Sequence, residues 1–383
     1  MAILGSLIEQ VRGVSYKPED LYTTLNKNSI TLLRANNIKD GQLNFDDVVY
    51  VDRKKVADKQ LLKAGDILIC ASSGSKELVG KAAYVASDLQ MTFGAFCKVV
   101  RPRIECSRYI GHFFNSPYYR ERITNSAAGA NINNIRNEHI DVLEIAWPSV
   151  EEQRSAVTVL DKVIELIALR KEQLAALDQL VKSRFIELFG DPETNPKGLE
   201  KALLSDIAEY FNGLTYSPDN VTNDGTIVLR SSNIQNSQLD FADTVRVNSS
   251  IKGKLFVKDN DILMCSRNGS ARLVGKVALI KNLSEPMTFG AFMMIIRSKY
   301  YPYLMTYFQM DAFRRQISTG ATTTINQITG NMLNKISLPL PKMADINEFA
   351  TFVEQTDKSK LAIQRSLDEL ETLKKALMQK YFG

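Results

Sequence analysis

The residues that most resemble a chemical motif in this sequence lie in a glycine-bounded segment, Gly74 to Lys81, whose pattern returns from Gly269 to Lys276. A glycine-rich turn that ends in lysine is typical of phosphate-binding loops. Here five residues separate the glycines instead of four, and Ala or Val follows the lysine where a Mg²⁺-binding Ser or Thr is required. The pattern therefore argues against a nucleotide site.

Other catalytic patterns are also incomplete. The segment Asn115–Tyr118 breaks the Asn-Pro-Pro-aromatic motif that an adenine methyltransferase needs, and it has no counterpart in the second half of the chain. His112 and His139 do not repeat, and we expect both to be surface or half-buried residues. The four cysteines show no CxxC spacing, so neither a zinc site nor a disulfide framework is indicated. Cys70 and Cys265 end apolar runs and are predicted to be buried in strands.

All these residues belong to a module that the chain carries twice. The hexapeptide Met91–Phe96 returns unchanged as Met287–Phe292. Further segments match at nearly constant spacing: Gly13–Pro18 with Gly213–Pro218, Leu33–Ile38 with Leu229–Ile234, Leu43–Phe45 with Leu239–Phe241, Ile132–Ile135 with Ile325–Ile328, and Leu188–Gly190 with Tyr381–Gly383. The chain is therefore one module of roughly 190 residues written twice.

Composition and charge bound what this module is. The chain has 383 residues, 44% of them hydrophobic and 24% charged, which is typical of a globular protein with two or three domains. It shows no stretch of ~18 apolar residues and no secretory leader, so we expect a cytoplasmic protein with no membrane partner. The net charge of +5 is compatible with a nucleic-acid partner but is not evidence for one.

Each module has two unlike parts. Residues 1–149 and 191–341 are rich in Gly, Asn, Ser and Pro between short β-branched runs, which predicts mixed α/β domains. Within them, Tyr109–Ile123 and Tyr301–Ile317 are each predicted to form one helix.

Two long helices are predicted after these domains, because residues 151–189 and 345–382 contain neither Pro nor Gly. Apolar residues follow one stripe in the first helix (Val157, Leu160, Ile164, Ile167, Leu174, Val181, Phe185, Leu188) and one in the second (Ile346, Phe349, Val353, Thr356, Ile363, Leu367, Leu370, Leu377). Such helices need partners, and the two stripes can cover each other in an antiparallel coiled coil. The alternative is that each helix packs on its own globular domain.

The predicted fold is therefore α+β. Two repeated mixed α/β domains, 1–149 and 191–341, are joined by antiparallel coiled-coil helices over 150–190 and 342–383, with pseudo-two-fold symmetry.

This order of parts resembles the specificity subunit of type I restriction-modification enzymes, and the resemblance covers essentially the whole chain. The helix entry Trp147–Arg154 resembles the family's proline followed by Glu-Gln-Arg, whereas Leu340–Asn347 departs from it at Gln-Arg. The resemblance implies a non-catalytic subunit whose two target-recognition domains each read one half of a split, asymmetric sequence in double-stranded DNA. It also implies that the helices set the spacing and carry two methyltransferase subunits, that restriction subunits dock as well, and that S-adenosylmethionine binds in the methyltransferase and not in this chain.

The loop that resembles a phosphate site suits DNA reading better. Its flanks are the same in Cys70–Lys81 and Cys265–Lys276, but Ser72, Ser73 and Glu77 are replaced by Arg267, Asn268 and Arg272. Arg pairs with guanine, Asn with adenine and Ser with either, so the two copies should prefer different bases. The alternative is that Ser, Asn and Gly only form turns.

The predicted DNA-binding set adds a second polar loop in each half, the segment near the front of each module, and two arginines present in both copies. Arg34 and Arg230 are predicted to be either ion-pair partners or phosphate clamps. The full set is Ser15, Tyr16, Lys17, Arg34, Asn36, Ser72, Ser73, Ser75, Lys76, Asn131, Asn133, Asn134, Thr215, Tyr216, Arg230, Arg267, Asn268, Ser270, Arg272, Thr322, Thr323, Thr324, Asn326 and Gln327.

Two other function classes stay open at this point. The chain could be a specificity module for a different nuclease or methyltransferase, or a scaffold of tandem domains that binds no nucleic acid. DNA binding that weakens steeply with salt would favour the DNA-reading classes, because phosphate contacts release counterions.

Overall fold

The computed structural model describes residues 1–75, 77–127, 133–318 and 327–383. The chain folds into two compact units, and each unit takes part of both long helices. Unit 1 comprises Met1–Glu172 and Gln364–Gly383, and unit 2 comprises Gln173–Ile363. These units do not coincide with the four predicted segments, because each helix is divided between them. The assignment of the segments as recognition domains and spacer helices stays a prediction.

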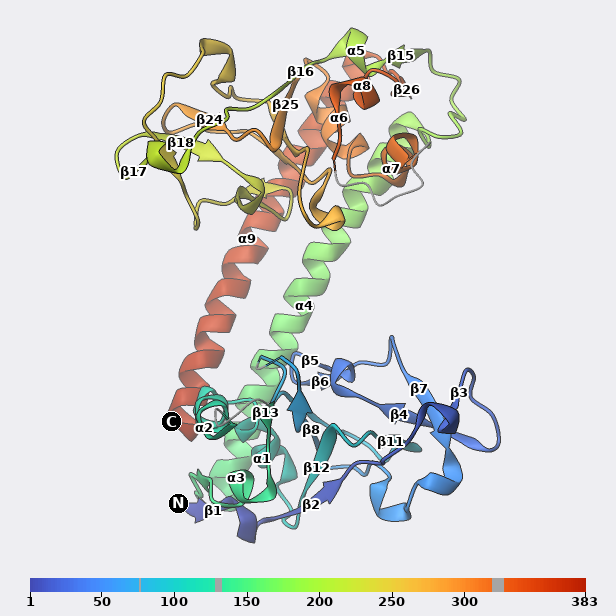
Figure 1. Cartoon of the computed structure of the whole chain (residues 1–383), viewed down its shortest axis with the longest axis vertical. Helices are drawn as coiled ribbons and strands as arrows, with labels where there is room; N and C mark the ends of the chain where they lie inside the picture. The colour runs from blue at the N-terminus through green and yellow to red at the C-terminus, as the bar shows by residue number, and fades with distance from the viewer. Residues whose placement is uncertain (76, 128–132, 319–326) are drawn as a thin grey trace. The chain divides into compact units, whose positions relative to one another are not determined.

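Two four-stranded sheets form the globular part of unit 1 (Figure 1). The first sheet is antiparallel and has the order β10-β8-β12-β2; the second has the order β11-β4-β7-β3, with β11 and β4 parallel. The first consists of β2 (Ile8–Arg12), β8 (Ile67–Cys70), β10 (Ala82–Tyr84) and β12 (Cys97–Pro102); the second of β3 (Leu21–Tyr22), β4 (Ser29–Leu33), β7 (Val49–Asp52) and β11 (Met91–Phe93).

The central strand β8 shows why this sequence forms a sheet with both faces covered. All four of its residues are buried. Because side chains alternate across a strand, Ile67 and Ile69 face one apolar cluster while Leu68 and Cys70 face another. A continuous apolar run is what a strand covered on both faces needs. The predicted burial of Cys70 and Cys265 is confirmed, since each is fully buried in its strand.

Unit 2 repeats both sheets strand by strand. The order β16-β25-β22-β23 corresponds to the first sheet, and β17-β21-β18-β24, with β18 and β24 parallel, corresponds to the second. These strands are β16 (Glu209–Asn212), β17 (Val221–Thr222), β18 (Thr226–Leu229), β21 (Arg246–Val247), β22 (Ile262–Cys265), β23 (Val277–Leu279), β24 (Met287–Phe289) and β25 (Met293–Arg297). The internal repeat predicted from the sequence is therefore a structural repeat.

Short strand pairs complete each unit. In unit 1 they are β1 (Ala2–Ile3) with β14 (Glu144–Ile145), β5 (Ile38–Lys39) with β6 (Gln42–Leu43), and β9 (Ser72–Ser73) with β13 (Asn133–Asn134). In unit 2 they are β15 (Lys201–Leu203) with β26 (Ser337–Pro339) and β19 (Ile234–Gln235) with β20 (Gln238–Leu239).

The single helices predicted over Tyr109–Ile123 and Tyr301–Ile317 are each two helices, so this prediction was wrong. Unit 1 has α1 (Ser107–Phe113) and α2 (Pro117–Ala127), and unit 2 has α6 (Tyr301–Tyr307) and α7 (Asp311–Ser318). Pro117 explains the first break, because proline favours the first turn of a helix and disfavours the interior. Among the described residues there are also three short α-helices: α3 (Asn137–Asp141), α5 (Leu204–Ile207) and α8 (Gly330–Leu333).

The two long helices are α4 (Val150–Phe189) and α9 (Met343–Phe382), and their presence is confirmed. They run antiparallel within each unit. In unit 1 the ammonium group of Lys171 lies 3.2 Å from the carboxylate of Glu371. In unit 2 Lys360 pairs with Asp178 at 2.5 Å and Arg184 with Glu348 at 2.5 Å. Every residue of the two predicted apolar stripes is buried or half-buried.

The helices also pack on the globular parts of the units. Both predicted ways of covering the apolar stripes, pairing of the helices with each other and packing on the globular domains, therefore occur together. In unit 1 the end of α9 lies beside α1 (Figure 1), where the ring of Phe382 is 4.9 Å from that of Tyr109. In unit 2 the end of α4 does the same, with Phe185 stacked on Tyr303 at 4.9 Å. Within the described residues, no helix combines the length and apolar composition that crossing a bilayer requires.

Candidate nucleic-acid interface

The loop after β8 and the polar segment that leads into α3 lie together in unit 1. Ser72 and Ser73 form β9 and pair with Asn134 and Asn133 of β13. The backbone N–H of Ile135 also donates to the carbonyl of Ala71 at 2.8 Å. Two stretches far apart in sequence, which were predicted separately, therefore form one polar ribbon.

Unit 2 builds the same ribbon with larger side chains. Arg267 forms a β-bridge with Gln327, and the N–H of Ile328 donates to the carbonyl of Ser266 at 2.7 Å. The guanidinium of Arg267 donates twice to Gln327 Oε1, from Nε at 3.0 Å and from Nη2 at 2.5 Å. Both residues are exposed. An arginine held in this way keeps its remaining donors aimed away from its partner, which suits recognition of a base edge.

Asn268 and Ser270 take part in the turn that follows. The amide of Asn268 donates to Ser231 Oγ at 3.2 Å, and its Oδ1 accepts the backbone N–H of Ser270 at 2.9 Å. Ser75 in unit 1 is held in the same manner, with its N–H 3.2 Å from Ser73 Oγ. Arg272 is exposed. Asn268, Ser270 and Ser75 therefore form turns, as the alternative interpretation predicted, and the same loop of unit 2 also carries an exposed hydrogen-bond donor, Arg272.

Both loops are fixed from behind by an arginine of the second short helix. The guanidinium of Arg120 on α2 donates to the carbonyl of Val79 at 2.7 Å, and Arg314 on α7 donates to that of Val274. The next residues, Gly80 and Gly275, have φ of +82° and +79°, which only glycine adopts readily. The Val-Gly turn therefore has the same structural role in both units, and this role explains why its sequence is unchanged between the two copies.

The segment resembling a phosphate-binding loop leads into β10 in unit 1 and β23 in unit 2. A phosphate-binding loop instead precedes a helix, whose N-terminal N–H groups hold the anion. Burial raises the pKa of the Cys70 and Cys265 thiols at the start of each loop, so they stay protonated near neutral pH. The geometry favours recognition over nucleophilic or phosphate chemistry.

The front segment of each module lies against the repeated hexapeptide. Val14 forms a bridge with Gly94, and Leu214 forms one with Gly290. The residues that follow, Ser15, Tyr16 and Lys17 in unit 1 and Thr215 and Tyr216 in unit 2, are exposed or half-buried. Lys17 is engaged by Glu19 at 3.5 Å. At its other end the hexapeptide contacts the polar ribbon, because the Phe96 carbonyl accepts the N–H groups of Ala71 and Ser72. The hexapeptide therefore connects the front segment with the polar ribbon.

Arg34 and Arg230 have carboxylate partners in the same place in both units. Arg34 Nη2 lies 3.0 Å from Asp47 Oδ2, and Arg230 Nη2 lies 2.8 Å from Asp243 Oδ2. Asn36 Nδ2 donates to the same Asp47 oxygen at 2.7 Å. Of the two roles predicted for these arginines, the geometry provides the ion pair, and contact with phosphate stays a prediction.

Six members of the predicted set lie outside the described residues, namely Lys76, Asn131, Thr322, Thr323, Thr324 and Asn326. Asn133 is placed only through its backbone pairing with Ser73.

The histidine predictions have mixed outcomes. His139 is half-buried as expected, but His112 is only 2% exposed, so the prediction of a surface or half-buried residue was wrong for it. It lies on the inner face of α1, with Nε2 3.0 Å from Asp161 Oδ1 of α4. Burial lowers the pKa of His112 more than Asp161 raises it, so the ring stays neutral near pH 7. It joins α1 to α4 through the partly exposed Asp161 and is itself covered by the two helices.

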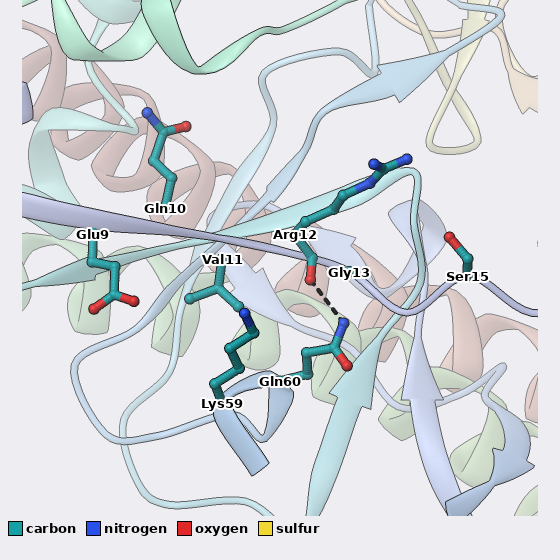
Figure 2. A pocket seen from close by; sticks show the side chains of 8 residues that line it. All are labelled: Glu9, Gln10, Val11, Arg12, Gly13, Ser15, Lys59 and Gln60. Atoms are coloured by element: carbon teal, nitrogen blue, oxygen red, sulfur yellow. Dashed lines mark hydrogen bonds between the residues drawn. The ribbon is translucent and has the colours of Figure 1, made fainter. Parts of the chain in front are cut away.

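A cleft of about 390 Å³ runs along the edge strand β2 (Figure 2). Gln10 and Arg12 leave this strand on the opposite side from Glu9 and Val11, as alternation along a strand requires (Figure 2). Gln60 Nε2 donates to the carbonyl of Arg12 at 3.0 Å and so covers the strand edge. The lining has no nucleophile paired with a base, and among the described residues no three His, Cys, Asp or Glu side chains could hold a metal ion.

Comparison with known proteins decides the family. The sequence model of the type I restriction modification DNA specificity domain matches residues 9–179 and again residues 196–373, one match for each copy of the module. The chain belongs to this family. The predicted family and its recognition of DNA sequence within a type I restriction-modification complex are confirmed.

Curated relatives of this specificity-domain family match the whole chain. It is 29% identical over 409 residues to the type I restriction enzyme EcoKI specificity subunit of Escherichia coli strain K12, and 29% identical over 417 residues to the StySPI specificity subunit of Salmonella potsdam. Both matches cover 100% of this chain and 88% of the relative.

Solved structures of type I systems share the fold. The S subunit from M. genitalium has a TM-score of 0.56 at 15% identity and is matched over 95% of its length. A chain from work on complex assembly and conformational transition of the type I R-M system has a TM-score of 0.53 at 18% identity and is matched over 99%. Each match covers 100% of this specificity-family chain.

Sequence reasoning missed two repeated features of this specificity-family chain. A buried carboxylate is paired with an arginine in each unit, Asp66 with Arg101 at 2.7 Å and Asp261 with Arg297 at 2.7 Å. Phe96 and Phe292 of the repeated hexapeptide are strongly exposed. The repeat itself was the available signal, because each of these residues recurs in the second copy.

Proposed function

We propose that this chain is the non-catalytic specificity subunit of a cytoplasmic type I restriction-modification complex and that it reads a split, asymmetric DNA target. Unit 1 reads one half of the target through the ribbon of Ser72 and Asn134. Unit 2 reads the other half through the ribbon of Arg267 and Gln327. The single observation that carries this proposal is that one scaffold, repeated strand for strand, presents different hydrogen-bonding side chains at the same place.

The helices α4 and α9 supply the surfaces for the other subunits in this proposal. Each unit contains a part of each helix, so each unit offers a two-helix surface on the same chain. We expect these two surfaces to bind two copies of a methyltransferase, with S-adenosylmethionine in the methyltransferase, and we expect restriction subunits to join the assembly.

The experiment is to co-express the chain with a type I methyltransferase of the same host and to sequence the methylated sites. One motif with two different halves around a fixed gap is expected. The native mass of the complex should correspond to two methyltransferases on one copy of this chain. Methylation by this chain alone, a palindromic motif, or a complex with one methyltransferase would contradict the proposal.

A matched exchange tests which unit reads which half. Replacing residues 191–341 by the equivalent region of a relative should change only one half of the methylated motif. Replacing residues 1–149 should change only the other half. A change in both halves after either exchange would contradict the assignment.

A further inference from the structure

The repeated hexapeptide divides its two phenylalanines between the core and the surface. Phe93 and Phe289 are completely buried, whereas Phe96 is 71% exposed and Phe292 is 59% exposed. Leaving a phenylalanine in water forgoes the stabilisation that burial gives. One such residue needs no explanation, but the same exposure at the equivalent position of both units indicates a use for the ring.

The backbone that carries these rings is held firmly in both copies. The carbonyl of Phe96 accepts the N–H groups of Ala71 and Ser72 at 2.9 and 3.0 Å. The carbonyl of Phe292 accepts those of Ser266 and Arg267 at the same two distances. Ser266 Oγ donates to it as well, at 3.0 Å. Each exposed ring therefore projects from the root of the polar ribbon and does not belong to a loose loop.

In unit 2 the ring is also next to the arginine predicted to read a base. The guanidinium carbon of Arg267 lies 5.8 Å from the centre of the Phe292 ring, within the range of a cation–π contact. A ring beside a cationic donor matches a surface that meets both the charged backbone and the apolar faces of DNA. A patch that bound another protein by apolar contact would not need these donors at its centre.

We propose that Phe96 and Phe292 are DNA-contacting residues, one in each half of the target, and that they contribute affinity without selecting the base. This inference rests on the proposed function of the two ribbons. The rings are the same in both units while their neighbours differ, Ser72 in one and Arg267 in the other. A contact common to two readers of different sequences cannot distinguish those sequences. It fits an apolar side chain that packs against sugars and base faces or enters a base step.

The test uses the assembled complex with its methyltransferase and a fluorescent duplex that carries the methylated motif. Phe96→Ala and Phe292→Ala should each weaken binding about tenfold, because each removes the burial of one phenylalanine at the interface. The methylated motif should keep all its letters in both variants. Phe292→Leu should retain most of the binding, because leucine serves as an apolar wedge as well.

Val221→Ala is the matched control, because it shortens another exposed apolar side chain of unit 2, 48% exposed, and should leave affinity unchanged. Unchanged affinity in both phenylalanine variants would overturn the inference. The inference would also be overturned if the phenylalanine variants released the methyltransferase while the complexes that stayed intact bound DNA with unaltered affinity. The rings would then contact protein and not DNA. Failure of the wild-type complex to prefer this duplex over a scrambled one would instead contradict the proposed function.

Discussion

Replacing Arg267 by alanine should relax one base position in one half of the DNA target. The guanidinium has five N–H donors, and Gln327 Oε1 engages Nε and Nη2. Three donors are left, which is enough for the two parallel hydrogen bonds that guanine accepts through O6 and N7. Losing such a pair costs about 1 to 3 kcal/mol, which is roughly a 5- to 150-fold loss of discrimination at that position.

Folding should be almost unaffected by this change. Arg267 is exposed, and surface substitutions usually change the free energy of unfolding by about 0.5 kcal/mol or less. Gln327 is exposed too, so its amide can bind water once the arginine is gone. The matched control is Arg230→Ala, which breaks the ion pair with Asp243 and should leave every base preference unchanged.

The assay is the methylome of cells that carry the variant complex, with the preference at each motif position as the readout. We expect relaxation at one position of the half read by unit 2 and full stringency in the other half. Unchanged stringency everywhere would refute the assignment of Arg267 as a reader. Relaxation in the half assigned to unit 1 would refute the assignment of halves to units.

Three further predictions concern the stability of unit 1 and the spacing set by the helices. For the Lys98 and Asp161 variants, the fluorescence of Trp147, the one tryptophan of the chain, reports unfolding of unit 1. Burial lowers the pKa of Lys98 to about 8, against the opposing effects of Asp141 and Glu138. The free energy of unfolding of the wild type should therefore rise by roughly 1 to 3 kcal/mol between about pH 8 and 10.5, because the unfolded chain binds more protons than the folded one in this range. Lys98→Met, which introduces the residue found at the equivalent position 294, should remove this rise, and a rise that persists would refute the role of Lys98. Burial raises the pKa of Asp161, but the nearby His112 ring and the hydrogen bonds from Arg108 outweigh this and lower the pKa to about 2. Asp161→Asn should cost about 1 kcal/mol above pH 4, after allowance for its partial exposure, and the difference from wild type should vanish as the pH falls toward 2; a constant difference across this range would contradict the pairing. Four residues inserted into both helices, after Ala175 and after Arg365, add about 6 Å of helix and should lengthen the unread gap of the motif without changing its halves. Altered letters with an unchanged gap would exclude a spacing role for the helices.

The repeat and the helices could be predicted because they depend on local patterns. The three- to four-residue spacing of apolar residues follows directly from helix geometry, and the absence of Pro and Gly bounds α4 and α9. The break between α1 and α2 was missed because the apolar pattern continues through it. Pro117 was the available signal, since proline is favoured at a helix start.

The ion pairs and the exposed rings could not be predicted from one copy of the module. Asp66 directly precedes β8 and Arg101 lies on the neighbouring strand β12, far from it in sequence, so only strand pairing brings them together. The exposure of Phe96 depends on where β11 ends, at Phe93, because the side-chain alternation of the strand stops there. The backbone at Phe96 is held by long-range hydrogen bonds, since Ala71 and Ser72 donate to its carbonyl, and such contacts are not visible in the sequence.

Duplication of the scaffold would allow one chain to read the asymmetric target proposed for it. Each unit has its own buried clusters, so the residues that fix β8 and β22 are separate from those that vary at the loop tips. Substitutions that are far apart and share no partner add independently in free energy. A change at Ser72 should therefore leave the preference at Arg267 intact. Two identical loops would select the same bases in both halves. If Arg267 reads a base as proposed, the replacement of Ser72 by Arg267 makes the two halves of the target differ at that position.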